Sequence, residues 1–251
     1  MPKILAGKTE IECRLIIFDR NGTLVDQQHF LLNLAKARFQ SLSKIAGVHV
    51  AKLWEKAVGT DLKHGCVDHN GPLATAPQRE ELLVAASVIY QCGHSWSEAK
   101  KIAQEAYDQA DESLKPTYGC VLFEGVSDIL RELKSNGVKL AIATTDSHKR
   151  TEESLNSLGV AQFFDAIIGA DDVENSKPAP DMVLEACRQT GCRPGDAVVV
   201  GDSSSDMMMG KNAKVKKCIA VLTGFTPKEK LQKIADVVIE SVNEIKSKND
   251  P

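Results

Sequence analysis

The sequence LIIFDRNGTL, residues 15–24, places a carboxylate directly after four apolar residues. An unbroken apolar run of this kind is typical of a strand that is buried on both faces. Asp19 follows the run, Gly22 allows a tight turn and Thr23 adds a hydroxyl. A carboxylate presented in this way can attack phosphorus and form an aspartyl-phosphate. We therefore predict Asp19 as a nucleophile, with Gly22 and Thr23 binding the phosphate. The alternative is that Asp19 only caps the following turn.

Five further apolar runs lie downstream and are predicted as strands: Val138–Ala143, Ala166–Ile168, Ala197–Val200, Ile219–Leu222 and Val237–Ile239. Helical patterns lie between them, and this alternation is typical of an α/β protein with helices on both faces of its sheet. We predict a Rossmann-like open parallel sheet. In such a sheet, ligands bind beyond the carboxyl ends of the strands, where the strand order reverses.

The stretch between residues 26 and 118 contains no convincing strand and four amphipathic segments that predict helices: Leu31–Ala46, Val50–Val58, Arg79–Cys92 and Ser97–Ser113. We expect residues 26–118 to form a helical cap inserted after the first strand. The α/β core is then made of residues 1–25 and 119–251. The segment Lys115–Gly119, KPTYG, has the composition of a hinge. The polar segment His64–Pro77 is either a connector within the cap or a loop that faces a substrate.

Composition and charge argue against several classes of protein. The 251 residues are 43% hydrophobic and 26% charged, and the net charge of −3 gives no electrostatic reason to expect nucleic acid or a membrane as partner. No apolar run approaches the roughly 20 residues of a membrane span, and residues 1–10 lack the apolar core of a secretory signal. The seven cysteines include no CxxC pair, which favours reduced thiols. We expect a cytoplasmic protein, and its oligomeric state is open.

Three polar residues each follow their own predicted strand: Asp19, Thr144 and Asp202. Parallel strands end at the same edge of a sheet, so we expect these side chains to meet there. A carboxylate can approach an anionic phosphate only when a cation neutralises them, and Mg²⁺ prefers oxygen ligands. We predict Asp19 and Asp202 as direct Mg²⁺ ligands, joined by the backbone carbonyl of Asn21. Asp206 is predicted as an outer ligand or as the group that orients a bound water.

Two further side chains complete the predicted site. Lys177 lies before a proline and is a compact point charge that suits an oxyanion, so we predict that it balances Asp19 and the phosphoryl group. Thr144 can donate a hydrogen bond to the phosphoryl oxygens. Thr145 competes for this role, but the apolar run ends nearer Thr144. Taken alone, Lys177 is also compatible with a surface loop, and Thr144 with a hydroxyl that bonds only to backbone.

Four motifs resemble those of the haloacid dehalogenase superfamily: DxxGTLVD at residues 19–26, Thr144, Lys177 and GDxxxD at residues 201–206. The helical insert resembles the C1-type cap of that superfamily. The cap position and the continuation TLVD look most like phosphoglycolate-phosphatase-type enzymes. The resemblance spans about residues 15–222 and implies a Mg²⁺-dependent phosphomonoester hydrolase of small phosphorylated metabolites, whose cap supplies specificity.

Asn21 departs from this pattern, because the phosphatases of the superfamily carry an Asp there that protonates the leaving group and then activates water. An amide can do neither, so we expect catalysis to be impaired. Three interpretations stay open: an Asp→Asn change introduced to hold a complex, a slow enzyme or one whose leaving group needs no proton, and a non-catalytic relative that binds a phosphometabolite. Acid–base help is worth about 10²–10⁴-fold, so Asn21→Asp is predicted to raise turnover by about 10²-fold or more. Lys214 is a second departure, where glycine is more usual.

Other chemistries of the superfamily stay as alternatives. A dehalogenase needs no metal, so Asp202 and Asp206 argue against it. A sugar phosphomutase depends on the proton shuttle that Asn21 cannot provide. A phosphonate hydrolase needs a small residue at position 21 and a lysine in the cap, for which the candidates are Lys44, Lys52, Lys56 and Lys63.

Overall fold

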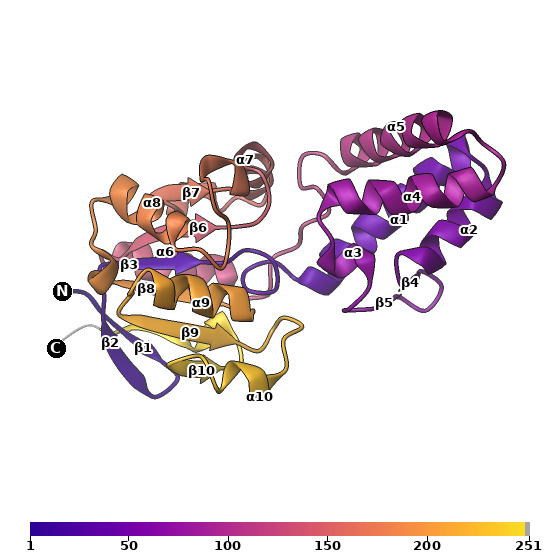
Figure 1. The fold of residues 1–251 in the computed structure, drawn as a ribbon. Coiled ribbons are helices and arrows are strands. Elements are labelled where there is room, and N and C mark those ends of the chain that lie inside the picture. Colours follow the sequence, from indigo (N-terminus) through magenta and orange to yellow (C-terminus); the bar gives the residue numbers. More distant parts are fainter. Residues whose placement is uncertain (249–251) are drawn as a thin grey trace. The chain divides into compact units, whose positions relative to one another are not determined.

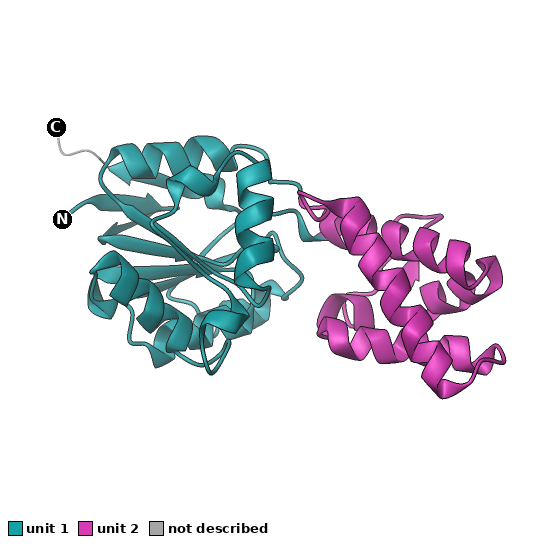
Figure 2. Ribbon diagram, turned by 90° about the horizontal axis from the view of Figure 1, so that it is seen from above, with its two compact units in different colours: residues 1–27, 121–251 teal, residues 28–120 magenta. Residues whose placement is uncertain are grey.

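The computed structural model describes residues 1–248, which form two compact units (Figures 1 and 2). One unit combines residues 1–27 with residues 121–248, and the other is made of residues 28–120. The divisions between the units fall two residues further along the chain than the predicted boundaries after residues 25 and 118.

The first unit contains a six-stranded parallel sheet with strand order β10-β9-β8-β3-β6-β7. Its strands are β3 (Leu15–Phe18), β6 (Lys139–Ala143), β7 (Ala166–Ile168), β8 (Ala197–Gly201), β9 (Lys217–Val221) and β10 (Val237–Ile239). Every predicted apolar run forms one of them, so the predicted α/β open parallel sheet is confirmed. The chain runs outward from β3 through β6 and β7, then returns to place β8 on the other side of β3. The strand order therefore reverses at β3, which is where a ligand site is expected.

Alternate residues of the strands enter two different cores. Ile16 and Phe18 pack on one face with Leu130 and Leu155, whereas Ile17 packs on the opposite face. The helices α6 (Val126–Ser135) and α7 (His148–Ser157) cover the first face. The helices α8 (Asp181–Thr190) and α9 (Ser204–Asn212) cover the second, and α10 (Lys228–Leu231) packs near β9 and β10. Burial on both faces explains why the strands show no polar alternation.

Three short strands of the first unit escaped the sequence analysis: β1 (Lys3–Ala6), β2 (Thr9–Glu12) and β11 (Ile245–Lys248). They form an antiparallel sheet with strand order β11-β1-β2. Lys3 pairs with Lys248 and with Glu12, so the two ends of the described chain lie side by side (Figure 1). Ile4 of β1 is buried in the same core as Ile16, which attaches this small sheet to the larger one.

The second unit is mainly helical. Its elements are α1 (Gln27–Ile45), α2 (Val48–Ala57), β4 (Thr60–Asp61), β5 (Cys66–Val67), α3 (Pro72–Thr75), α4 (Gln78–Gln91) and α5 (Trp96–Leu114). Each predicted helix overlaps α1, α2, α4 or α5. The helix α5 begins one residue earlier than predicted, at Trp96 and not at Ser97. Its N-cap is Ser95, which exchanges hydrogen bonds with Glu98 in a capping box. The polar segment His64–Pro77 contains β5 and α3. The sequence analysis found no convincing strand in this unit, and it missed the antiparallel pair of β4 and β5 because two-residue strands are too short to show a periodic pattern.

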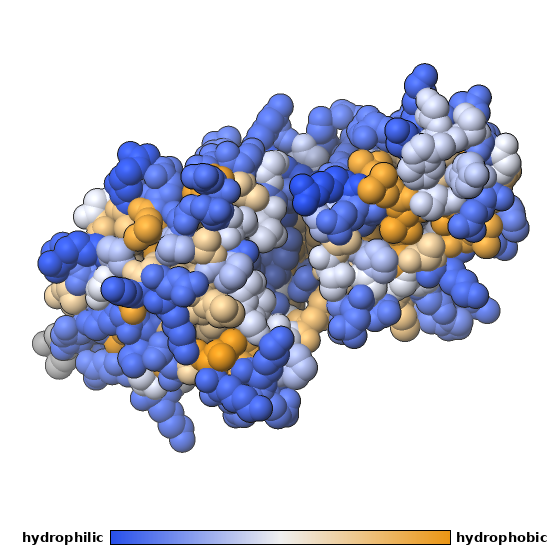
Figure 3. Space-filling view, viewed as in Figure 1, coloured by the Kyte–Doolittle hydropathy of each residue, from blue (hydrophilic) through white to orange (hydrophobic). Residues whose placement is uncertain are grey.

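Hydrophilic residues cover most of the faces seen in Figure 3, with small apolar patches between them. Among residues 1–248, the longest helices are too short or too polar to cross a membrane. All seven cysteines are free. The cytoplasmic location remains a prediction.

Candidate active site

The loop after β3 is held by its own backbone. The carbonyl of Arg20 accepts hydrogen bonds from the N–H groups of Leu24 and Val25, both at 2.9 Å. Gly22 lies at φ +84°, a conformation that disfavours any side chain, and a Cβ there would lie 2.7 Å from Oδ2 of Asp202. Gly22 donates its N–H to the carbonyl of Val25 at 2.8 Å. A phosphate-binding role for Gly22 stays a prediction, and the structure adds that this glycine makes room for Asp202.

The sequence GDSSSD, residues 201–206, forms the end of β8 and the start of α9. Ser203 caps the helix: its Oγ accepts from the N–H of Asp206, and Asp206 Oδ2 accepts from the N–H of Ser203 at 3.0 Å. A Cβ at position 201 would lie 2.4 Å from Cγ of Asp206, so this position requires glycine. The capping box thus fixes one oxygen of Asp206 and leaves its Oδ1 to face Lys177.

Lys177 bridges two carboxylates that are far apart in the sequence. Its Nζ donates to Oδ1 of Asp19 at 2.6 Å and lies 2.7 Å from Oδ1 of Asp206. The Lys177 side chain is buried. Burial lowers the pKa of this lysine, but the charges of Asp19 and Asp206 outweigh that effect and leave the pKa above its usual range. Lys177 is therefore favoured as a cation between the carboxylates of Asp19 and Asp206, and its role toward a phosphoryl group stays a prediction.

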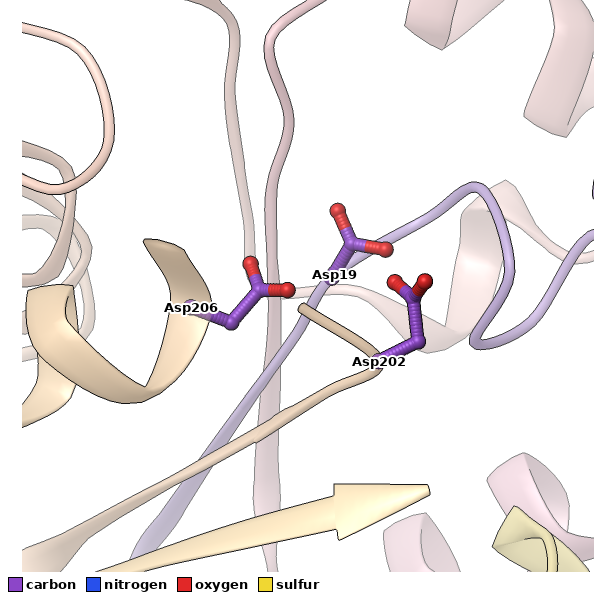
Figure 4. Close-up of side chains that lie close together, drawn as sticks. All are labelled: Asp19, Asp202 and Asp206. Atoms are coloured by element: carbon purple, nitrogen blue, oxygen red, sulfur yellow. The ribbon is translucent and has the colours of Figure 1, made fainter. Parts of the chain in front are cut away.

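The carboxylates of Asp19, Asp202 and Asp206 converge at the carboxyl ends of β3 and β8 (Figure 4). One oxygen from each lies within 4.8 Å of the others, and all three residues are buried. Burial raises the pKa of Asp19 despite the opposing charge of Lys177. Burial, together with the charges of Asp19 and Asp206, holds the pKa of Asp202 well above its usual range. Beside burial, the raised pKa of Asp19 and Asp202 has an electrostatic cause, because three acidic groups lie close together with only one lysine to offset their charge.

This donor set fits a hard divalent cation. Oδ2 of Asp19 is buried and accepts no hydrogen bond from the part of the chain that the structure describes. A buried carboxylate oxygen without a partner is costly unless a cation meets it. Carboxylate oxygens at this spacing are the ligands that Mg²⁺ prefers. Asp19, Asp202 and Asp206 are therefore the residues that can hold Mg²⁺.

The two threonines occupy different environments. Thr144 is buried directly after β6, and its Oγ1 accepts a hydrogen bond from the N–H of Asp146 at 3.2 Å. Its own hydroxyl proton is thus left to donate elsewhere. Thr145 is exposed. Thr23 is buried, and within residues 1–248 its hydroxyl finds no hydrogen-bond partner.

The sequence analysis missed two features of this site. Gly224 is one of them, because a Cβ there would lie only 1.8 Å from Oδ2 of Asp202. The neighbouring Thr223 donates its hydroxyl to the carbonyl of Gly22 at 2.6 Å. A signal was available, since Thr223 and Gly224 closely follow the β9 strand at the same edge of the sheet. The other feature is the buried Arg20, which contacts Asn21 and Asp146.

Residues 82–221 match the model of the family described as haloacid dehalogenase-like hydrolase. The match covers more than half of the chain, and the chain therefore belongs to this family. It includes Thr144, Lys177, Asp202 and Asp206, and it begins after the loop that carries Asp19.

Curated relatives agree with this assignment. The chain is 27% identical over 209 residues to pyrophosphatase PpaX of Halalkalibacterium halodurans, which covers 83% of this chain and 84% of that protein. It is 27% identical over 217 residues to phosphoglycolate phosphatase 1 of Pseudomonas aeruginosa, and the aligned region covers 84% of this chain and 70% of that protein. Among solved structures, a HAD-superfamily hydrolase of subfamily IA from Geobacter sulfurreducens has a TM-score of 0.61 at 22% identity, covering 92% of this chain and 94% of that one. The last comparison supports the fold alone.

Proposed function

We propose that this protein is a Mg²⁺-dependent phosphatase that hydrolyses a small phosphorylated metabolite, phosphoglycolate or a similar compound, through an aspartyl-phosphate on Asp19. The observation that carries the proposal is the bridge from Lys177 Nζ to Asp19 and Asp206, at 2.6 and 2.7 Å, beside the carboxylate of Asp202. A pair of acidic groups and one lysine next to a candidate nucleophile is the arrangement that phosphoryl transfer needs, because positioning and charge supply most of the catalysis.

Asp19, Asp202 and Asp206 would hold the metal, together with the backbone carbonyl of Asn21. When bound, Mg²⁺ supplies positive charge that offsets the repulsion between the carboxylates and an anionic phosphate. The phosphatase relative of Pseudomonas aeruginosa supports the phosphorylated small-molecule substrate. Residues 28–120 would serve as the cap that supplies specificity, with Lys115–Gly119 as a hinge.

The protein side chains would act in two steps. A carboxylate oxygen of Asp19 forms a bond to phosphorus while the bond from phosphorus to the leaving-group oxygen breaks, and that oxygen keeps the electron pair. The oxygen of a water molecule then bonds to phosphorus as the Asp19–phosphorus bond breaks, which releases inorganic phosphate and restores the carboxylate. Lys177, Thr144 and Thr23 would hold the phosphoryl oxygens throughout, because each offers a donor at a buried position.

Asn21 decides how fast these steps run. The first step needs a proton for an alkoxide leaving group and the second needs a base for the attacking water, and an amide supplies neither. We expect slow turnover of alkyl phosphates and a smaller loss for aryl phosphates, whose leaving groups need little protonation. The aspartyl-phosphate should then persist on Asp19.

A second candidate substrate is inorganic pyrophosphate. The pyrophosphatase relative named above suggests it. The missing proton donor at position 21 also favours it, because a phosphate leaving group, with a second pKa of about 6 to 7, needs less help from an acid than an alcohol does.

A panel of phosphorylated metabolites, an aryl phosphate and pyrophosphate tests the proposal, with Mg²⁺ and with excess chelator. The matched control is Asp19→Asn, which keeps the size of the side chain and removes the nucleophile. We expect turnover that requires both Mg²⁺ and Asp19. Metal-dependent binding of phosphate without any turnover would instead show a non-catalytic binding protein. Full activity in excess chelator would contradict the proposal and favour a metal-independent dehalogenase.

A further inference from the structure

Arg20 is the residue directly after the candidate nucleophile, and its side chain is fully buried. A buried guanidinium is costly unless its donors find partners. Three of them do so here: Nη2 donates to Asp146 Oδ2 at 2.8 Å, Nη1 to Ser154 Oγ at 3.2 Å and Nε to Asn21 Oδ1 at 3.2 Å. Arg20 is therefore built into the site.

The contact with Asn21 fixes the orientation of its amide group. The Nε atom of arginine can only donate a hydrogen bond, so the atom that faces it must be an acceptor. In an asparagine side chain only the oxygen accepts, and the two N–H donors lie on the other branch of the amide. Arg20 thus holds Asn21 with its oxygen occupied and its N–H donors turned away from the guanidinium.

The contact with Asp146 extends this network to the second loop of the site. The N–H of Asp146 donates to Oγ1 of Thr144 at 3.2 Å, and the Asp146 carboxylate also lies 3.4 Å from Nε of Arg150. Arg20 therefore joins the loop after β3 to the loop after β6. Both loops lie at the carboxyl edge of the sheet, on adjacent strands.

We propose that Arg20 and Asp146 are positioning residues, which turn the Asn21 amide so that its N–H donors serve the phosphorylated ligand and which hold Asn21 and Thr144 in a fixed relation. This inference rests on the proposed function of the same site. It gives Asn21 a role of its own, as an oriented neutral hydrogen-bond donor where a proton shuttle is absent.

A spectroscopic experiment tests the contact without any need for turnover. The side-chain amide signals of Asn21 in a ¹⁵N–¹H correlation spectrum are identified by their loss in Asn21→Ala. Arg20→Lys keeps a cation near Asp146 but has no Nε donor, so we expect these signals to shift. Arg150→Lys perturbs the same carboxylate and is the matched control, which should leave them near their wild-type positions. We also expect inorganic phosphate with Mg²⁺ to shift the Asn21 signals of the wild type.

A kinetic double-mutant cycle tests the positioning role with the aryl phosphate as substrate. Arg20→Lys should lower kcat about tenfold when residue 21 is Asn, and less than about twofold when it is Ala, with KM little changed. A merely structural role would lower kcat equally in both backgrounds.

Equal losses in both backgrounds, or unchanged Asn21 signals in Arg20→Lys, would overturn the inference. If no variant and no wild-type sample turns over substrate, the proposed function fails, and the same cycle is then read from the affinity for inorganic phosphate with Mg²⁺. Arg20→Lys must weaken that affinity only in the Asn21 background for the inference to stand.

Discussion

The two units of the molecule each bury charge, but they do so in opposite ways. In the helical unit, Arg38 and Glu81 form a buried ion pair, and the Arg38 guanidinium lies 4.2 Å from the ring centre of Tyr107. Tyr107 accepts a hydrogen bond from Trp54 Nε1 at 3.0 Å and donates to the carbonyl of Glu81. One positive and one negative charge balance here. In the α/β unit, the carboxylate cluster of Asp19, Asp202 and Asp206 shares the single lysine Lys177.

This difference separates a charge pair that is complete within the fold from a charge cluster that can bind a ligand. A balanced pair incurs a desolvation cost when it is buried, but its charges neutralise each other and it has no need of a ligand. In the unbalanced cluster, burial and the charges of Asp19 and Asp206 raise the pKa of Asp202, and the cluster stays unfavourable until a cation arrives. Perturbed acids grouped at a sheet edge are a common mark of a functional site. We therefore expect the two clusters to respond in opposite ways to mutation and to metal.

The largest effect on stability is expected in the helical unit. Glu81→Gln leaves the Arg38 guanidinium buried without a countercharge, which should cost about 3 to 5 kcal/mol. Replacing both members, as in Arg38→Met with Glu81→Met, should recover much of that loss. Chemical denaturation measures both. The single variant should keep its Mg²⁺ response at the α/β site, and a loss below about 1 kcal/mol would remove the contrast between the clusters.

The next effect concerns Asn21 and sharpens the prediction made from the sequence alone. Asn21→Asp would place a carboxyl beside the Arg20 guanidinium, and a neighbouring cation lowers the pKa of a carboxyl, so a smaller fraction of it carries the proton that the leaving group needs. General acid–base help is worth about 10²-fold or more, and we expect the turnover of Asn21→Asp alone to rise by less than that. The double variant Arg20→Met with Asn21→Asp should turn over about tenfold faster than Asn21→Asp alone. Steady-state kinetics with an alkyl phosphate measures the gain. If Asn21→Asp leaves the rate unchanged with either residue at position 20, another group handles the proton.

A smaller effect is expected from relieving the carboxylate cluster. The folded-state pKa of Asp202 is raised, so the metal-free protein binds an extra proton when folded. Its stability should therefore fall as the pH rises from about 4 through that raised pKa. Asp202→Asn removes this loss and should raise the melting temperature of the metal-free protein near neutral pH by about 2 to 4 °C for each kcal/mol.

Mg²⁺ should reverse the order of the melting temperatures of the wild type and of Asp202→Asn. It should stabilise the wild type and have little effect on Asp202→Asn, because the variant lacks a metal ligand. Thermal unfolding at several pH values, with chelator or with Mg²⁺, checks both statements. An Asp202→Asn protein that melts below the wild type in chelator at neutral pH would show that the cluster is not under repulsion.

The smallest effect lies outside both clusters. Lys214 has φ +57° in the turn after α9, where its N–H donates to Lys211 and the N–H of Val215 donates to Gly210. This is the helix ending that favours glycine, and it explains why lysine is unusual at this position. Lys214→Gly should stabilise the protein by about 1 kcal/mol through relief of that conformation. The gain should be the same with chelator and with Mg²⁺, and a metal-dependent gain would contradict this local explanation.

The sequence was sufficient for the sheet because its strands are buried on both faces. The bounds of β3 were predicted to the residue, since four apolar residues between polar neighbours leave little choice. The three strands of the small antiparallel sheet were missed for the opposite reason. Thr9–Glu12 is short and mostly exposed, and Lys3 pairs with Lys248 across nearly the whole chain, which no local pattern reveals.

The candidate site shows the same division. Asp19, Thr144 and Asp202 were predicted to meet because each follows a strand at the carboxyl edge of a parallel sheet, and the structure brings the carboxylates of Asp19 and Asp202 together with that of Asp206. Their catalytic roles remain predictions. The pairing of Arg20 with Asp146 could not be predicted, because an arginine in a polar loop is more often exposed than buried. Only the fold turns Arg20 inward and gives Asn21 a partner.

The most direct test of the account is the intact mass of the protein after a brief reaction. Wild-type protein with Mg²⁺ and an aryl phosphate is quenched in acid and weighed, beside Asp19→Asn and a sample in excess chelator. We predict one added phosphoryl group on the wild type alone, mapped to Asp19, because Asn21 slows its hydrolysis. A phosphoryl group on Asp19→Asn, or wild-type turnover without any phosphorylated protein, would contradict the assignment of Asp19 as the nucleophile.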